Sequence, residues 1–240
     1  MTAASPSALG VLVLGFGLGL RHALDVDHVA AVSAIVSRRP GLWSASAVGA
    51  LWGLGHTCAL LAVALLVVVA HVEIPGWLAP GLEIGVAAML IGLGVNLFRT
   101  LRQGGTLHVH RHRHGVREHV HLHAHGHAGA HGAFHHAVPG ARRPFCVGVV
   151  HGLAGSAGLM LAVVATIPSR ALALCYVVTF GCGSIGGMLL MSLVLGVPAT
   201  LAADRGARLG HALQLCAAAC CVGVGMLLAW RVGVDAGVFA

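Results

Sequence analysis

Long apolar stretches alternate with short polar ones along most of this 240-residue chain. Six of these stretches are long enough to cross a bilayer as helices, because about 20 apolar residues span its hydrocarbon core. The predicted spans run from about Ala8 to Val36, Leu42 to Ala70, Trp77 to Phe98, Phe145 to Ile167, Ala171 to Val197 and Gly210 to Trp230. The pattern predicts an all-α polytopic membrane protein with six transmembrane helices.

The composition agrees with this class. Hydrophobic residues make up 58% of the chain, charged residues only 9%, and the mean hydropathy is +0.90, values typical of membrane proteins. The thirty-five glycines would weaken a soluble helical protein, but in a membrane they let helices approach closely. The seven cysteines contain no CxxC pair, so neither a disulfide framework nor a thiolate site is indicated.

The distribution of arginines predicts the topology. All fourteen basic residues are Arg, and eleven of them lie in the loops after the first, third and fifth spans, against two on the opposite side. The positive-inside rule assigns these three loops to the cytoplasm and both termini to the outside. The net charge of +7 therefore reflects topology rather than a nucleic-acid partner. With no signal-peptide features, we expect the first span to be retained in the inner (plasma) membrane.

Twelve of the eighteen histidines lie between Leu107 and Ala137, in strings such as HVHRHRH and HVHLHAHGHAGAHGAFHH. Such low-complexity tracts bind metal ions. The tract lacks the fixed spacing of a closed zinc site, so we expect loose binding of several ions in a cytoplasmic loop that acts as a buffer or sensor. The alternatives are an expression tag or a neutral disordered linker.

The two halves of the chain resemble each other. GLRHALDVDH from Gly19 aligns with GVVHGLAGSA from Gly148, and WGLGHT from Trp52 aligns with FGCGSI from Phe180, at offsets of 129 and 128. Chance matching in glycine-rich sequence is the alternative to duplication. A duplicated unit of three spans must reverse its orientation, which predicts the 3+3 inverted repeat of secondary transporters. The resulting segments are a first repeat at 1–98, a His-rich loop at 99–143 and a second repeat at 144–240.

Five ionisable residues interrupt the first apolar stretch, within RHALDVDH: Arg21, His22, Asp25, Asp27 and His28. Each charged group near the bilayer centre costs roughly 2.5 kcal/mol or more, so a function or a partner must offset the cost. Two imidazoles and two carboxylates suit borderline metal ions such as Ni(II), Co(II) and Zn(II). The motif therefore predicts a transition-metal site within the membrane.

Helix geometry divides these ligands. In a regular helix His22, Asp25 and His28 share one face, and Asp27 joins them only if the helix unwinds. A break near Gly15, Gly17 and Gly19 would also free backbone carbonyls.

Further candidates lie outside the motif. His56 in the second span is the natural additional ligand, and His151 in the fourth span is either a ligand or a group that orients one. The alternative for both is a structural histidine. Thr57 could orient an imidazole, and Glu83 is either interfacial or a ligand on the ion's way to the site. Arg21 is expected to pair with Asp25 or with a neighbouring span. The candidate metal residues are His22, Asp25, Asp27, His28, His56 and His151.

HALDVDH resembles the HxxxxDH signature of the nickel/cobalt permeases, the NiCoT family. GLGHT, HGLAGSAGLM and FGCGSIGGM resemble its six-helix branch, which includes urease-associated permeases and nickel/cobalt exporters. The resemblance implies that His22, Asp27 and His28 are essential, with Asp25 inside the motif and His56 at a second one. It covers the spans but not the loop. The chain lacks the upstream helix and the second acidic motif of the eight-helix permeases, which leaves the direction of transport open.

These features predict a secondary, ATP-independent transporter of Ni(II), with Co(II) as a second substrate, rather than an enzyme. No resident cofactor and no nucleic-acid partner are expected, and a homo-oligomer is left open. A membrane potential favours inward movement of a cation by about 2.3 kcal/mol per charge per 100 mV, so uptake is favoured. Efflux is the alternative, which a cytosolic histidine loop would suit, and a membrane-anchored metallochaperone or sensor is another.

Overall fold

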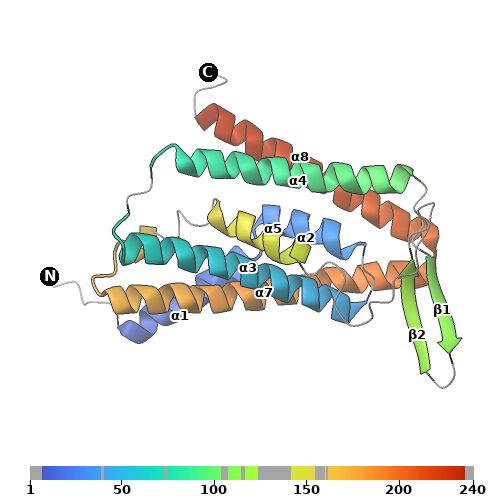
Figure 1. Cartoon of the computed structure of the whole chain (residues 1–240), viewed down its shortest axis with the longest axis horizontal. Helices are drawn as coiled ribbons and strands as arrows, with labels where there is room; N and C mark the ends of the chain where they lie inside the picture. Colours follow the sequence, from blue (N-terminus) through green and yellow to red (C-terminus); the bar gives the residue numbers. More distant parts are fainter. Residues whose placement is uncertain are drawn as a thin grey trace.

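The computed structural model describes residues 7–38, 41–72, 75–103, 108–114, 117–123, 142–154, 160 and 162–235. Long helices follow one axis of the molecule, and a β-hairpin lies at the end opposite the N-terminus (Figure 1). The elements are α1 (Ala8–His22), α2 (Val26–Val36), α3 (Leu42–Val68), α4 (Leu78–Arg102), β1 (His108–His114), β2 (Arg117–His123), α5 (Arg142–Leu153), α7 (Arg170–Arg205) and α8 (Ala207–Asp235).

Four of the described helices, α3, α4, α7 and α8, are each long and apolar enough to cross a membrane. The pair α1 and α2 passes the same test as one broken span, which gives up to five. The predicted first span over 8–36 therefore consists of two helices separated by a break. In the predicted fourth span, α5 has only 12 residues, so the described residues contain no sixth helix that passes the test.

The first span breaks at residues 23–25, where the chain bends by 55°. Asp25 has an extended backbone and occupies the N-cap position of α2, a position that Asp favours. The expected break near Gly15, Gly17 and Gly19 is not found. Gly15 and Gly19 lie where α1 packs closely on α7, against Tyr176 and the carbonyl of Phe180. These two glycines thus serve helix packing, and the break falls inside the polar motif.

Nine of the described glycines lie directly against a backbone carbonyl of a partner helix, with little or no room for a Cβ atom, and six of them make reciprocal contacts between pairs of helices. These six pair Gly19 with Phe180 and Gly183 with Phe16 between α1 and α7, Gly55 with Phe145 and Gly148 with Trp52 between α3 and α5, and Gly94 with Ala218 and Gly225 with Ala87 between α4 and α8. Small residues permit this close approach of helices in membranes.

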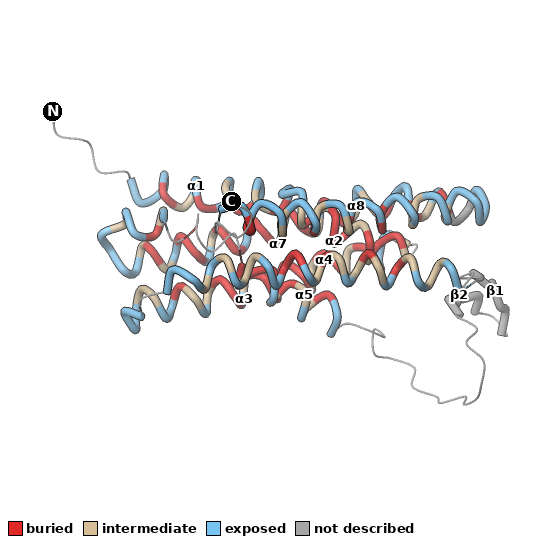
Figure 2. Tube along the Cα trace, turned by 90° about the horizontal axis from the view of Figure 1, so that it is seen from above, coloured by how far each residue is buried: buried red, intermediate tan, exposed pale blue. Residues whose placement is uncertain are grey.

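Buried residues line the inward sides of the helices, and exposed residues lie on their outer sides (Figure 2). Large apolar side chains are prominent among the exposed ones, including Trp43, Leu9 and Trp77 at 87%, 73% and 72% exposure. An apolar exterior of this extent is unusual for a soluble monomer and suits contact with lipid. The described helices therefore support the assignment to the membrane-protein class.

Part of the histidine tract forms an antiparallel hairpin, which the all-α prediction did not include. His108 lies opposite His123, His110 opposite His121, and His112 opposite His119. Alternation of one residue type with period two is the pattern of a β-strand, and HVHRHRH and REHVHLH both have it. The rest of the tract lies outside the described residues, and metal binding by the tract remains a prediction.

Candidate metal site

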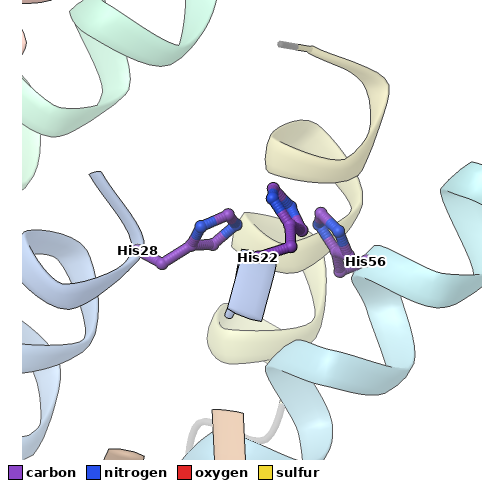
Figure 3. Close-up of side chains that lie close together, drawn as sticks. All are labelled: His22, His28 and His56. Carbon is purple, nitrogen blue, oxygen red and sulfur yellow. The ribbon is translucent and has the colours of Figure 1, made fainter. Parts of the chain in front are cut away.

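Three histidines from three helices lie together where the first span breaks (Figure 3). His22 is the last residue of α1, His28 lies in the first turn of α2, and His56 lies within α3. One ring nitrogen of each lies within 4.8 Å of those of the other two. The bend of 55° brings His28 beside His22, with their ring centroids 4.6 Å apart. The break therefore assembles the group.

Asp27, His28 and His151 form a second group, whose candidate ligand atoms also lie within 4.8 Å of one another. The Nε2–H of His151 donates to Oδ2 of Asp27 over 2.7 Å, and Nδ1 of His28 lies 3.5 Å from Oδ1 of Asp27. Asp27 lies just after the break, in the first turn of α2. From the sequence we expect Asp27 to join the other ligands only if the helix is interrupted, and the break provides that interruption. His28 belongs to both groups.

Asp25 belongs to neither group. Its carboxylate accepts a hydrogen bond of 2.7 Å from Nδ1 of His22, and its side chain is 53% exposed. The bond fixes the His22 ring and leaves Nε2 buried without a hydrogen-bond partner. Carboxylates often orient metal-binding histidines in this way. The expected pair between Arg21 and Asp25 is absent from the described part of the chain, where His22 is the ion-pair partner of Asp25.

Six buried ring nitrogens in the two groups have no hydrogen-bond partner among the described residues. They are Nε2 of His22, both nitrogens of His28, both nitrogens of His56, and Nδ1 of His151. His28, His56 and His151 are at most 2% exposed, and buried polar atoms in proteins nearly always have a partner. A divalent transition-metal ion, for which imidazole nitrogen and carboxylate oxygen are suitable ligands, could satisfy several of them at once.

Close packing of α3 on α5 holds His56 and His151 near each other. Gly152 lies against the carbonyl of His56, and Gly148 lies against that of Trp52, so little separates the two backbones. These contacts fix how α3 and α5 are aligned along their axes, and with it the relative positions of the two histidines. Both side chains can then face the break in the first span.

Thr57 does not orient an imidazole. Its hydroxyl donates to the carbonyl of Gly181 over 3.2 Å, which joins α3 to α7. Sequence reasoning missed Trp52, a fully buried side chain whose ring centroid lies 5.5 Å from that of His151 and 6.4 Å from that of His28. Trp52 precedes His56 by four residues, a spacing that puts both on one helix face, and that signal was available in WGLGHT.

No family model matches the chain, and no solved structure matches it. Among curated proteins, it is 32% identical over 197 residues to the urease accessory protein UreH of Bacillus sp. (strain TB-90), a match that covers 82% of this chain and 81% of that protein. It is also 37% identical over 73 residues to the high-affinity nickel transport protein of Cupriavidus necator, covering 27% of this chain and 18% of that protein. These matches confirm the resemblance drawn from HALDVDH, and the chain belongs to the NiCoT family, together with the urease accessory protein UreH.

Proposed function

We propose that this protein is a secondary transporter that carries Ni(II), and Co(II) as a second substrate, across the inner membrane in the direction of uptake. The observation that carries the proposal is the set of six buried imidazole nitrogens without a hydrogen-bond partner at the break in the first span, together with the carboxylate of Asp27. The name of one relative, the high-affinity nickel transport protein, supports nickel as the substrate. The family match makes transport a better account of these groups than catalysis.

The ion is the cargo, and we propose that His22, His28 and His56 bind it on one side of the break and Asp27, His28 and His151 on the other. Nitrogen and carboxylate oxygen ligands favour Ni(II) and Co(II) over Mg(II) or Ca(II). Asp25 acts through His22, because its carboxylate holds the ring with Nε2 available. Neutral imidazoles and one ionised carboxylate would bind a dication while keeping the net charge of the site low.

We propose a topology of six spans, with α5 beginning the fourth, both termini outside and the His-rich loop in the cytoplasm. The arginine distribution supports this orientation. The position of the hairpin at the end of the molecule opposite the N-terminus is consistent with it (Figure 1). For an ion of charge +2, a potential of 100 mV, negative inside, contributes about 4.6 kcal/mol towards uptake, so no ATP hydrolysis is needed.

The reciprocal glycine contacts support an inverted repeat. Gly148 follows Gly19 by 129 positions and Gly183 follows Gly55 by 128, the offsets of the two sequence matches. The carbonyls that these glycines meet are related in the same way, since α1 packs on α7 as α5 packs on α3. A transporter with this symmetry alternates access around a central site, and the histidine groups lie where the two halves meet.

Uptake of radioactive nickel by proteoliposomes containing the purified protein tests the proposal, with and without a membrane potential and a proton gradient. We expect uptake that rises with an inside-negative potential and that Co(II) inhibits competitively. Transport that requires a proton gradient opposed to nickel movement would instead show efflux. Nickel binding without any movement across the bilayer would favour a membrane-anchored chaperone or sensor and would overturn the proposal.

A further inference from the structure

A cavity of about 810 Å³ lies beside the histidine groups, between the broken first span, α4, α5 and α8. Its lining runs from His22 and His28 to Glu83, near the start of α4, and to Asp235, the last residue of α8. In the proposed topology the start of α4 and the end of α8 both lie on the outer side. The cavity thus connects that side with the proposed binding groups.

Charged residues gather in this cavity. They are Arg21, Asp25, Asp27, Glu83, Arg231 and Asp235. The whole chain has seven acidic residues, and four of them line this one cavity, with two arginines, so the lining carries a net charge of −2. A cleft lined by an excess of one sign of charge concentrates ions of the opposite sign and raises their rate of arrival by roughly 10-fold to 1000-fold, an effect that salt suppresses.

The inner end of the cavity is lined by buried histidine nitrogens that lack hydrogen-bond partners. His28 and His151 line it, at 1% and 2% exposure, and both ring nitrogens of His28 and Nδ1 of His151 have no hydrogen-bond partner among the described residues. Buried imidazoles without partners, at the end of an acidic cavity, are suited to receive a divalent cation. They are a second observation, independent of the carboxylates.

We propose that this cavity is the vestibule through which the divalent cation reaches His28, and that Glu83 and Asp235 attract the ion electrostatically without binding it tightly. The inference rests on the proposed function. Glu83 and Asp235 lie outside both histidine groups and belong to α4 and α8, which pack against each other. Their charges therefore act on arrival of the ion and leave the bound state nearly unchanged.

Arg231 supplies a control of opposite sign. It lines the same cavity, one helical turn before Asp235 on α8. If the field in the vestibule sets the rate of arrival, removing this positive charge has the opposite effect to removing a carboxylate. A structural role for Glu83 or Asp235 does not predict this reversal.

The test is initial-rate nickel uptake in proteoliposomes by the full chain and by Glu83→Gln, Asp235→Asn, the double variant and Arg231→Gln, at low and high salt. One charge acting on a dication at roughly 10 Å in a water-like medium corresponds to about a fourfold effect. We expect the KM for nickel to rise about three- to fivefold in each carboxylate variant and more in the double variant, with Vmax unchanged. We expect the KM to fall in Arg231→Gln, and these differences to shrink at high salt.

The vestibule proposal is wrong if the KM for nickel is unchanged in the double variant. It is also wrong if the KM changes in the same direction in Arg231→Gln as in the carboxylate variants. The rate at which Ni(II) quenches tryptophan fluorescence after rapid mixing gives a second measurement, because Trp52 adjoins His28 and His151. If the wild-type protein binds nickel but does not move it, the proposed transport fails. The vestibule is then judged by whether the two carboxylate variants slow quenching and Arg231→Gln accelerates it.

Discussion

His28 is the residue on which both histidine groups depend, because its ring is the member that they share. Replacing His28 with Ala removes a ligand from each group, and no described neighbour can supply another. We expect loss of nickel transport in the His28→Ala variant, with the protein still inserted in the membrane. His211, an exposed histidine of α8 outside both groups, is the matched control, and His211→Ala should transport like the wild type. Nickel uptake in proteoliposomes measures both.

If the His28→Ala variant transports nickel like the wild type, the metal site does not lie in the broken first span. His56→Ala should fall between loss and wild type, because it weakens only one group. No effect of that change would make His56 a structural histidine.

The two carboxylates of the motif differ in what they touch, and their amide variants should differ accordingly. Asp27 is 30% exposed and bonded to His151, whereas Asp25 is 53% exposed and bonded to His22. Asp27→Asn removes the charge next to the ion and should abolish uptake. Asp25→Asn keeps a polar partner for His22 and should reduce uptake only several-fold. Uptake rates and nickel affinity by calorimetry measure both, and an equal loss in the two variants would contradict this division of roles.

The structure brings five of the six residues predicted from the sequence into the two groups, but the sequence did not separate their positions. Ionisable groups in an apolar span can be recognised from the sequence alone, because burying them in lipid costs free energy that a function or a partner must offset. Which carboxylate meets His151 depends on the break at 23–25, and the signal for that break within HALDVDH is weak, because it consists of Asp25, a residue type that favours the N-cap of a helix. Trp52 was missed for the opposite reason, since an apolar residue in an apolar span attracts no attention.

At the scale of helices, the close contact of α1 with α7 depends on Gly19. A Cβ atom there would overlap the backbone carbonyl of Phe180, and a carbonyl cannot move aside as a flexible side chain can. We expect Gly19→Ala to destabilise the protein by about 1–3 kcal/mol, the usual effect of overpacking, and to reduce uptake. Gly17 lies on the same helix with open space around its Cβ position, so Gly17→Ala should be neutral or slightly stabilising. Thermal unfolding in detergent compares the two variants.

Equal melting temperatures for Gly17→Ala and Gly19→Ala would show that α1 and α7 are farther apart than the structure has them. The prediction also bears on the site, because Gly19 lies one turn before His22. A shift of α1 would move that ring away from His28 and His56.

Hydropathy predicted the four helices that are each long and apolar enough to cross a membrane. The spans from Leu42 and from Trp77 match α3 and α4 to within a few residues at each end, since an uninterrupted apolar stretch in lipid has to satisfy its backbone as a helix. Average apolarity does not report where a helix stops, so the break inside the first span and the end of α5 at Leu153 were not predicted. The hairpin was missed because the tract was judged by composition, although its alternation has the period of a strand.

At the scale of the whole molecule, the described part of the histidine tract, the hairpin of β1 and β2, lies at the end opposite the N-terminus (Figure 1). A chain lacking residues 108–136 should still transport nickel, with uptake reduced at low metal or misregulated. Calorimetry should show several weak sites lost with the deletion and at least one retained. Complete loss of transport in a correctly inserted deletion variant would make the tract part of the pathway, and would favour the efflux or chaperone alternatives.

The tract should also respond to pH in its own way. Neutral imidazole is the ligand, and its ordinary pKa is about 6.5, so binding is complete above that value and is lost as protons compete at lower pH. We expect the weak sites of the intact protein to disappear between pH 7 and pH 5, in a calorimetric titration repeated at both values. Weak sites that persist at pH 5 would show that ligands other than histidine hold the metal there.

The reciprocal glycine contacts have a mechanical consequence. They join α1 to α7 and α3 to α5, and α3 also packs extensively on α7, so these four helices form one closely packed body. The pair of α4 and α8 is joined in the same way, and it meets this body mainly through the shorter α2. Rocking of one body against the other would leave the glycine contacts within each body intact. In the proposed transport cycle, the three-residue bend at 23–25 would be the hinge for such a movement, and the bound ion would lie beside it.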